Sequence, residues 1–344
     1  MRIAQLAPLS ESVPPKTYGG TELVVSLLTE ELVKNGHEVT LFASGDSETT
    51  AKLISVTAKS LRADTTIPIR RWQAYDLCSL IELEQRQNEF DIIHNHMGYQ
   101  AFSFIKDFKC ANVTTNHNIV KDYCAPIYLH YADLPFVAIS ESYKALNYPD
   151  KLNYAATVYN GIDVSQYTFT QNQRREYLLF IGRICRDKGT ATAIEIALAL
   201  GIPLKIAGKV DEADKDYFEE QIKPLLSNPT IEYLGEVGLI EKAKLYSEAI
   251  AVLYPIAFEE PFGLVMAESL ATGTPVVALN RGSVKEIIID KETGIVANTK
   301  EEIISRFGEI GKISHQACRD RAVKLFSSQT MVAYYQALYA LLCR

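Results

Sequence analysis

The chain has 344 residues, 47% of them hydrophobic and 22% charged, and its formal net charge is −7. This balance is typical of a folded soluble protein and excludes extended disorder and fibrous repeats. The acidic surplus argues against nucleic acid as a partner, and at about 150 residues per domain the length favours two domains.

The chain carries no obvious membrane or export segment. Its longest apolar run, residues 249–258, is shorter than the roughly 20 residues of a spanning helix. Residues 1–8 lack the apolar core of a signal peptide, and the six cysteines form no Cys-x-x-Cys pair. We therefore expect a cytoplasmic protein with reduced thiols.

The first elements alternate between strand and helix. Residues 2–7 form a short apolar strand, and a loop rich in proline and glycine follows. Residues 21–33 place apolar side chains at helical spacing, and residues 38–43 form the next strand. This is a βαβ unit with a glycine pair, Gly19 and Gly20, where its helix begins.

The same alternation continues along the chain. Further strands are expected at residues 91–94, 111–115, 136–139, 156–159, 177–182, 204–208, 231–234, 251–254 and 275–278. Near-continuous apolar strands alternating with helices predict parallel sheets covered on both faces. Residues 329–342 read as one last helix.

A polar stretch without periodicity, residues 164–176, divides this pattern in two. We therefore place an N-terminal domain at residues 1–167 and a C-terminal domain at residues 168–324, followed by a final segment at 325–344. Both domains are expected to be doubly wound α/β sheets, which bind ligands at the carboxyl ends of their strands. The cleft between two such domains is the expected site.

The densest group of candidate residues follows the strand at 251–254. Pro261 suits a helix entrance, and Gly263 lets the backbone approach a ligand. Free N–H groups at a helix start bind anions or hydroxyls. Glu260 and Glu268 are eight positions apart, about two turns, so one could lie at the helix entrance and the other deeper on the same helical face. The alternative is that both are solvated surface acids.

Two other loops could contact phosphate. Arg183 and Lys188 lie between a strand and a helix, where they could clamp a diphosphate or simply be solvated. Gly19 and Gly20 could admit a phosphate or merely turn the chain. The pair is not the Gly-x-Gly-x-x-Gly of dinucleotide binders, which disfavours a nicotinamide enzyme.

Three histidines follow strands in the first half: His94, His96 and His117. Zinc is disfavoured because no His-x-x-x-His or cysteine ligand pattern accompanies them. His117 is the strongest candidate for a functional role, since catalytic groups collect in such loops. A structural or hydrogen-bonding histidine is the alternative reading.

In this order and spacing the motifs resemble those of the retaining family 4 glycosyltransferases, which have the GT-B fold of two Rossmann-like domains facing across a cleft. The matching motifs are Gly19-Gly20, Asn160-Gly161-Ile162-Asp163, Gly182-Arg183, Lys188-Gly189, Glu260 with Glu268, residues 273–278 and residues 281–288. The chain departs from the commoner pattern at Pro261, Arg281 and Lys285.

The resemblance implies a role for each matching residue of the C-terminal half. Arg183 and Lys188 would bind the donor diphosphate and neutralise the leaving nucleotide, while Glu268 would bind the ribose hydroxyls. Glu260 would bind the hydroxyls of the donor sugar. Three backbone N–H groups would assist it: those of Phe262, Gly263 and Leu264.

In the N-terminal half the resemblance implies that Gly19 and Gly20 let a loop close over the phosphates. It places His117 near the reactive carbon of the sugar and the acceptor. It also implies that the final helix, after Lys324, crosses back to the first domain.

The implied reaction moves a hexose from a nucleotide-diphosphate sugar to a hydroxyl of a glycan, glycolipid or small molecule, with retention. A UDP-sugar is favoured and GDP-mannose is the alternative donor. Fixed cations would replace a metal, no Asp-x-Asp lies within these motifs, and no cofactor is expected.

Three alternative functions remain: a glycoside phosphorylase, a UDP-sugar 2-epimerase and a non-catalytic sugar- or nucleotide-binding module. A lipid acceptor would imply peripheral contact with the inner membrane face, for which Arg70, Arg71 and Trp72 are a small basic and aromatic patch.

Overall fold

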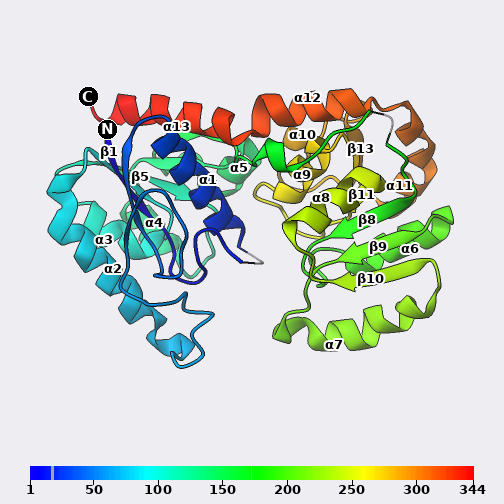
Figure 1. Cartoon of the computed structure of the whole chain (residues 1–344), viewed down its shortest axis with the longest axis horizontal. Coiled ribbons are helices and arrows are strands. Elements are labelled where there is room, and N and C mark those ends of the chain that lie inside the picture. The colour runs from blue at the N-terminus through cyan, green and yellow to red at the C-terminus, as the bar shows by residue number, and fades with distance from the viewer. Residues whose placement is uncertain (17–18, 172) are drawn as a thin grey trace. The chain divides into compact units, whose positions relative to one another are not determined.

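Two parallel β-sheets form the framework of the chain, one in each of two units (Figure 1). The computed structural model describes residues 1–16, 19–171 and 173–344. One unit comprises Met1–Gly161 together with Ser328–Arg344, and the other comprises Ile162–Ser327. The expected boundaries, after residues 167 and 324, lie beside these junctions. Two doubly wound parallel sheets with helices confirm the predicted fold class.

Within the described residues the first sheet has seven strands in the order β3-β2-β1-β4-β5-β6-β7. Their bounds are β1 Arg2–Leu6, β2 Glu38–Phe42, β3 Lys52–Ile54, β4 Ile92–Asn95, β5 Ala111–Asn116, β6 Phe136–Ala138 and β7 Tyr154–Thr157. The strand order reverses between β1 and β4, and ligands of doubly wound sheets bind at the carboxyl ends of strands beside such a point.

Six helices accompany this sheet among the described residues: α1 Gly20–Lys34, α2 Trp72–Arg86, α3 Phe102–Ile105, α4 Ala125–His130, α5 Glu141–Leu146 and α13 Ser328–Leu342. A cluster of aromatic side chains packs around Phe102, the first residue of α3. Its ring centroid lies 5.0 Å from that of Tyr128 and 5.5 Å from that of Phe136, in edge-to-face geometry. Such pairs contribute about 0.5–1.5 kcal/mol each beyond the area that they bury.

The last helix, α13, belongs to the first unit although the second unit precedes it in sequence. It buries Met331, Tyr335 and Tyr339, which recur every four residues on one helical face. The backbone N–H of Gly161 lies 3.0 Å from the Met331 sulfur. A Cβ at Gly161 would lie 2.8 Å from the Cα of Ser328, so only glycine fits where the two segments meet.

In the second unit the described strands run in the order β10-β9-β8-β11-β12-β13. Their bounds are β8 Tyr177–Ile181, β9 Leu204–Ala207, β10 Ile231–Gly235, β11 Ala249–Tyr254, β12 Val276–Leu279 and β13 Gly294–Ala297. The helices are α6 Thr190–Leu200, α7 Lys215–Tyr217, α8 Leu239–Glu248, α9 Leu264–Ala271, α10 Val284–Ile287, α11 Lys300–Arg306 and α12 His315–Phe326. The order reverses between β8 and β11, whose carboxyl ends lead into the loops that carry Arg183 and Glu260.

The polar stretch at residues 164–176 is attached to the second unit rather than being a loose linker; its residue 172 lies outside the described residues. Tyr167 is buried, and its carbonyl accepts a hydrogen bond of 2.8 Å from Arg319. Arg175 donates to the carbonyl of Ala249 at 2.9 Å. The lack of periodicity therefore corresponds to irregular backbone. Hydrogen bonds from two arginine side chains hold that backbone in place.

Gly189 and Gly201 flank α6, and both have left-handed backbone conformations, with φ of 76° and 66°. A Cβ at Gly189 would lie 2.0 Å from the carbonyl oxygen of Pro255, whereas a Cβ at Gly201 meets no atom within 4 Å. Gly201→Ala should cost about 1–2 kcal/mol of strain, and Gly189→Ala a further ~1–3 kcal/mol for the clash.

Thermal unfolding of the two variants tests this difference. Gly189→Ala should lower the Tm clearly more than Gly201→Ala does. Equal losses would show that the close approach between Gly189 and Pro255 does not constrain the loop that carries Lys188.

Candidate functional site

An ion pair joins two of the predicted motifs in the second unit. Lys188 lies just before α6, and Glu260 lies in the loop between β11 and α9. The Nζ atom of Lys188 is 2.7 Å from Oε2 of Glu260. The hydroxyl of Tyr254, at the end of β11, donates to the same oxygen at 2.6 Å. The ammonium group also lies 4.8 Å from the ring centroid of Phe258, within cation–π range.

This pair is largely shielded from solvent. Glu260 is 9% exposed, and the side chain of Lys188 is 21% exposed. Removing one partner of such a pair leaves a charge that is poorly solvated and unpaired, which is costly. The pair therefore holds a cation and a carboxylate at the carboxyl edge of the second sheet.

The loop that carries Glu260 is fastened by the segment around Gly282. The backbone N–H of Ser283 donates to the carbonyl of Glu260 at 2.9 Å, and its hydroxyl donates to the carbonyl of Phe262 at 2.7 Å. A Cβ at Gly282 would lie 2.4 Å from the backbone nitrogen of Glu260, which explains the glycine in this motif. Glu259 accepts a hydrogen bond from the Gly282 N–H.

Helix α9 begins at Leu264, with Gly263 before it in a left-handed conformation, φ 81°. Pro261 therefore lies in the turn before the helix and not in its first turn. Glu260 also precedes the helix, so the two glutamates do not share one helical face. The predicted N–H groups of Phe262, Gly263 and Leu264 lie just before and at the first residue of the helix.

Glu268 lies inside α9 and is buried, at 3% exposure. Lys242 lies 2.7 Å from its Oε1 atom, and the hydroxyl of Tyr246 donates to Oε2 at 2.8 Å. Burial alone would raise the pKa of Glu268, but Lys242 and Tyr246 outweigh it and bring this pKa below its ordinary value. Glu268 is therefore an ionised carboxylate at neutral pH, not the solvated surface acid of the alternative reading.

Arg183 contacts acidic partners of its own. Its guanidinium lies 3.4 Å from Asp211 and 3.5 Å from Asp214, and Lys209 also pairs with Asp211 at 3.0 Å. The Arg183 side chain is 35% exposed, and partly exposed pairs at these distances contribute about 0–1 kcal/mol. A phosphate could therefore replace the aspartates at little cost.

One of these partners, Asp214, begins an Asp-x-Asp sequence, Asp214-Lys215-Asp216, which lies outside the motifs named above. It spans a 3₁₀ turn at Glu212–Asp214 and the start of α7. Among the residues that the structure describes, no three or more histidine, cysteine or acidic side chains are grouped so that they could hold a metal ion.

In the first unit, His117 follows β5, and its Nε2 atom lies 2.9 Å from Nδ1 of His96, which follows β4. Burial lowers the pKa of His117 to about 4. His94 and His96 are fully enclosed, and burial brings the pKa of each well below 6.5. All three histidines are therefore neutral at pH 7.

The glycine pair stands at the start of α1. Gly19 has φ 158°, and a Cβ there would lie 2.8 Å from Pro15 and 2.9 Å from the carboxylate of Glu22. Its carbonyl accepts the first backbone hydrogen bond of the helix from Leu23, at 3.0 Å. Tyr18, which precedes the pair, lies outside the described residues.

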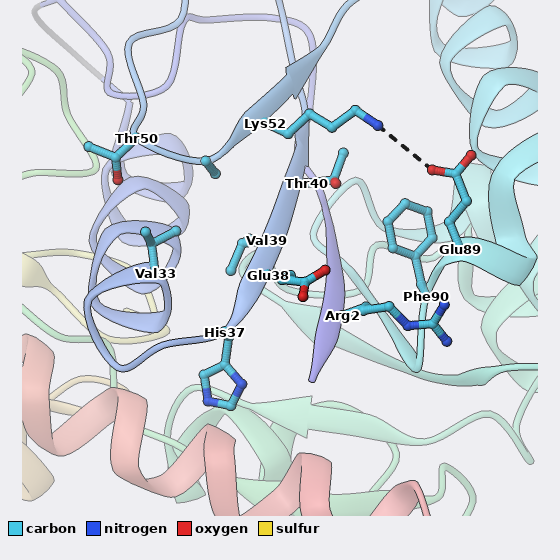
Figure 2. Close-up of a pocket in the computed structure, with 11 residues that line it drawn as sticks. Arg2, Val33, His37, Glu38, Val39, Thr40, Thr50, Lys52, Glu89 and Phe90 are labelled. Atoms are coloured by element: carbon cyan, nitrogen blue, oxygen red, sulfur yellow. Dashed lines mark ion pairs between the residues drawn. The ribbon is translucent and has the colours of Figure 1, made fainter.

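A hollow of about 410 Å³ in the first unit lies at the opposite edge of the sheet (Figure 2). It is lined at the amino ends of β1 and β2 by Arg2, His37 and Glu38. Lys52 and Glu89 form an ion pair of 3.7 Å across it. None of the predicted site residues lines this hollow. Ligands of such sheets bind at the other edge, where the strands have their carboxyl ends.

The basic patch lies just before and at the start of α2. Arg70 and Arg71 are exposed, whereas the Trp72 indole is partly buried and donates to the carbonyl of Ile67 at 3.3 Å. Among the described helices, none has both the length and the apolarity that crossing a membrane requires.

Known proteins resemble this chain in sequence and in fold. Residues 18–166 match the family model described as Glycosyltransferase Family 4, and residues 166–313 match that described as Glycosyl transferases group 1. The chain is 26% identical over 336 residues to the uncharacterized glycosyltransferase MJ1607 of Methanocaldococcus jannaschii, over 85% of this chain and 84% of that protein.

Two solved structures illustrate the likeness in fold. Sucrose-phosphate synthase from Thermosynechococcus elongatus has a TM-score of 0.80 at 20% identity, covering 99% of this chain and 98% of that one. Anabaena Alr3699/HepE in complex with UDP-glucose has a TM-score of 0.75 at 18% identity, covering 99% and 100%. Together with the two consecutive family matches, these comparisons confirm the expected fold and enzyme class: the chain belongs to the family 4 glycosyltransferases, transferase enzymes with the GT-B fold.

Proposed function

We propose that this enzyme transfers a hexose from a UDP-sugar to a hydroxyl acceptor in glycan biosynthesis, with retention of anomeric configuration. The observation that carries the proposal is the enclosed pair of Lys188 and Glu260 beside the start of α9. It offers a cation for a leaving phosphate and a carboxylate for sugar hydroxyls within one hydrogen bond of each other.

Lys188 stabilises the leaving nucleotide. Breaking the bond between the sugar and the diphosphate develops negative charge on the leaving oxygen. An ammonium group has three donors, so Lys188 can keep Glu260 as a partner and still bind phosphate. Because Glu260 and Phe258 already hold it, little reorganisation accompanies the reaction.

Arg183 is the second phosphate ligand of the proposal. In the structure its partners are Asp211 and Asp214, at 3.4 and 3.5 Å. A guanidinium forms two parallel hydrogen bonds to phosphate, which are stronger than these long contacts. We therefore expect Arg183 to exchange the aspartates for the diphosphate when the donor binds.

Glu260 acts as a ligand for sugar hydroxyls rather than as a nucleophile. Its Oε2 atom accepts hydrogen bonds from both Lys188 and Tyr254, which lowers its nucleophilicity. The neighbouring N–H groups of Phe262, Gly263 and Leu264 would bind the same sugar. This arrangement favours displacement on one face of the sugar, with the leaving phosphate helping to deprotonate the acceptor. A trapped covalent sugar on Glu260 would contradict it.

From the first unit, His117 and the turn at Gly19 and Gly20 complete the proposal. His117 would contact the donor sugar near its reactive carbon, and the glycine turn would bring backbone N–H groups to the phosphates. A neutral imidazole offers one donor and one acceptor, which suits the positioning of a hydroxyl.

A panel of donors tests the reaction. The purified protein is incubated in EDTA with UDP-glucose, UDP-galactose, UDP-N-acetylglucosamine or GDP-mannose, and free UDP or GDP is measured. We expect slow release of UDP from one UDP-sugar, because water can replace the acceptor and fixed cations replace a metal.

Two outcomes would contradict the proposal. Release that requires added Mg²⁺ or Mn²⁺ would overturn metal independence and point to the carboxylates of Asp214 and Asp216. An absence of nucleotide binding, together with cleavage of a disaccharide by inorganic phosphate, would identify a phosphorylase instead.

Substituting Glu268 tests the ribose assignment. Its protein partners are Lys242, Tyr246 and Tyr167, and a carboxylate has about four acceptor sites, so a ribose hydroxyl can still bind it. Glu268→Gln should weaken UDP binding about tenfold, or about 1.4 kcal/mol, because hydrogen bonds to a charged acceptor are stronger. The measurement is a calorimetric titration with UDP.

Glu195→Gln provides the control, since Glu195 forms an exposed ion pair with Lys300 on the same unit. It should leave the Kd for UDP unchanged. An unchanged Kd in a folded Glu268→Gln variant would remove Glu268 from the nucleotide site.

A further inference from the structure

A stack of three histidines lies at the carboxyl ends of β4 and β5. The ring centroids of His94 and His96 are 3.9 Å apart, and those of His96 and His117 are 5.2 Å apart. His96 and His94 are buried beneath His117, which is only partly buried. Only His117 has a role in the proposed function, so the purpose of the other two is open.

Both ring nitrogens of His96 are engaged. Its Nε2 atom lies 2.9 Å from the amide oxygen of Gln5, and its Nδ1 atom lies 2.9 Å from Nε2 of His117. An amide oxygen can only accept a hydrogen bond. The hydrogen between Gln5 and His96 therefore sits on Nε2 of His96.

His96 carries no second hydrogen. It is 4% exposed, and neither ring nitrogen contacts a carboxylate. A proton on Nδ1 would create a buried cation against the rings of His94 and His117, which is strongly unfavourable. Nδ1 of His96 is therefore an acceptor, and Nε2 of His117 must be the donor. The lone pair of His117 is left on its Nδ1 atom.

The orientation of the Gln5 amide depends on α13, the last helix of the chain. The amide nitrogen lies 3.3 Å from the hydroxyl oxygen of Tyr339, and that hydroxyl lies 2.6 Å from Nδ1 of His94. The amide nitrogen can only donate, so the Tyr339 oxygen accepts from Gln5 and its single hydroxyl hydrogen goes to Nδ1 of His94. His94 then donates through Nε2 to the hydroxyl of Thr115, at 2.7 Å. Each of these contacts, from Gln5 through Tyr339 and His94 to Thr115, therefore has one donated hydrogen.

We propose that Gln5, His96 and Tyr339 are positioning residues that hold His117 in the tautomer protonated on Nε2. The inference rests on the proposed function of His117. It makes Tyr339 of the last helix, 222 positions beyond His117, part of the transfer site in the first unit. Through Nδ1, His117 then accepts a hydrogen bond from a hydroxyl of the sugar or the acceptor. If the network ran in the opposite direction, His117 would donate from Nδ1 instead.

Nuclear magnetic resonance of ring-¹⁵N histidine reads the tautomer directly. Long-range proton–nitrogen correlations distinguish a protonated from a bare ring nitrogen, and His117→Gln assigns the His117 signals by their loss. In the unmodified protein we expect His117 with hydrogen on Nε2 only. Hydrogen on Nδ1 of His117 would overturn the proposal, whatever the enzyme's activity.

Two tyrosines on the same helix provide a matched pair of variants. Tyr339→Phe removes the group that orients the Gln5 amide, so signals of both His117 tautomers should appear. Tyr335→Phe removes a buried hydroxyl that contacts only Thr115 in this network, at 2.8 Å, and should leave the tautomer unchanged. The Tm of both variants reports their structural cost. A single, unchanged tautomer in Tyr339→Phe would show that α13 does not hold it.

Kinetics on the donor identified by the panel complete the test. Tyr339→Phe and Gln5→Met should each lower kcat by about tenfold and leave KM for the donor within about twofold, as expected for a misoriented group. Tyr335→Phe should change neither. A fall in kcat without a change of tautomer would contradict the inference. If no donor is turned over, the proposed function fails, while the spectra still decide the tautomer.

Discussion

The ion pair between Lys188 and Glu260 is the interaction on which the second unit's site depends. Neither charge is well solvated, so each needs the other, and the pair ties the loop after β8 to the loop after β11. Both loops leave the sheet where its strand order reverses, as ligand-binding loops of such sheets do. Gly189 and Gly282 also keep these loops in position. A side chain at Gly189 would clash with the backbone of Pro255, and one at Gly282 would clash with the backbone of Glu260. The donor chemistry that we propose therefore uses a site that is already organised.

Much of the fold was accessible from the sequence because apolar strands of parallel sheets are nearly continuous. The strands at residues 2–7 and 251–254 correspond to β1 and β11, each buried along most of its length. The short strands β3 and β13 were missed: β3 has three residues and exposes its first, and β13 has four residues and begins with a glycine. The packing of the polar stretch at 164–176 onto the second unit could not be predicted, because the arginine contacts that hold it leave no periodic signal.

The candidate site was predicted as separate motifs, and the structure supplies what joins them. Spacing in sequence suggested that Glu260 and Glu268 share a helical face, but α9 begins only at Leu264. The partners of these acids, Tyr254 and Lys242, were not found, since each lies on another element and belongs to no motif. Gln5 offered a weak signal as the polar residue of an apolar strand. Its link to His117 through His96 could not be read from the sequence, because strand order sets it.

A double-mutant cycle on Lys188 and Glu260 tests the central claim most directly. Lys188→Met, Glu260→Gln and the double variant are compared by kcat/KM for the UDP-sugar, with Tm as the measure of folding. Each single change should lower kcat/KM by about 10²–10³, because it removes one half of a unit that binds and stabilises charge. The account predicts that the double variant is little worse than the poorer single variant. Losses that simply multiply would show that the two residues act independently and would contradict it.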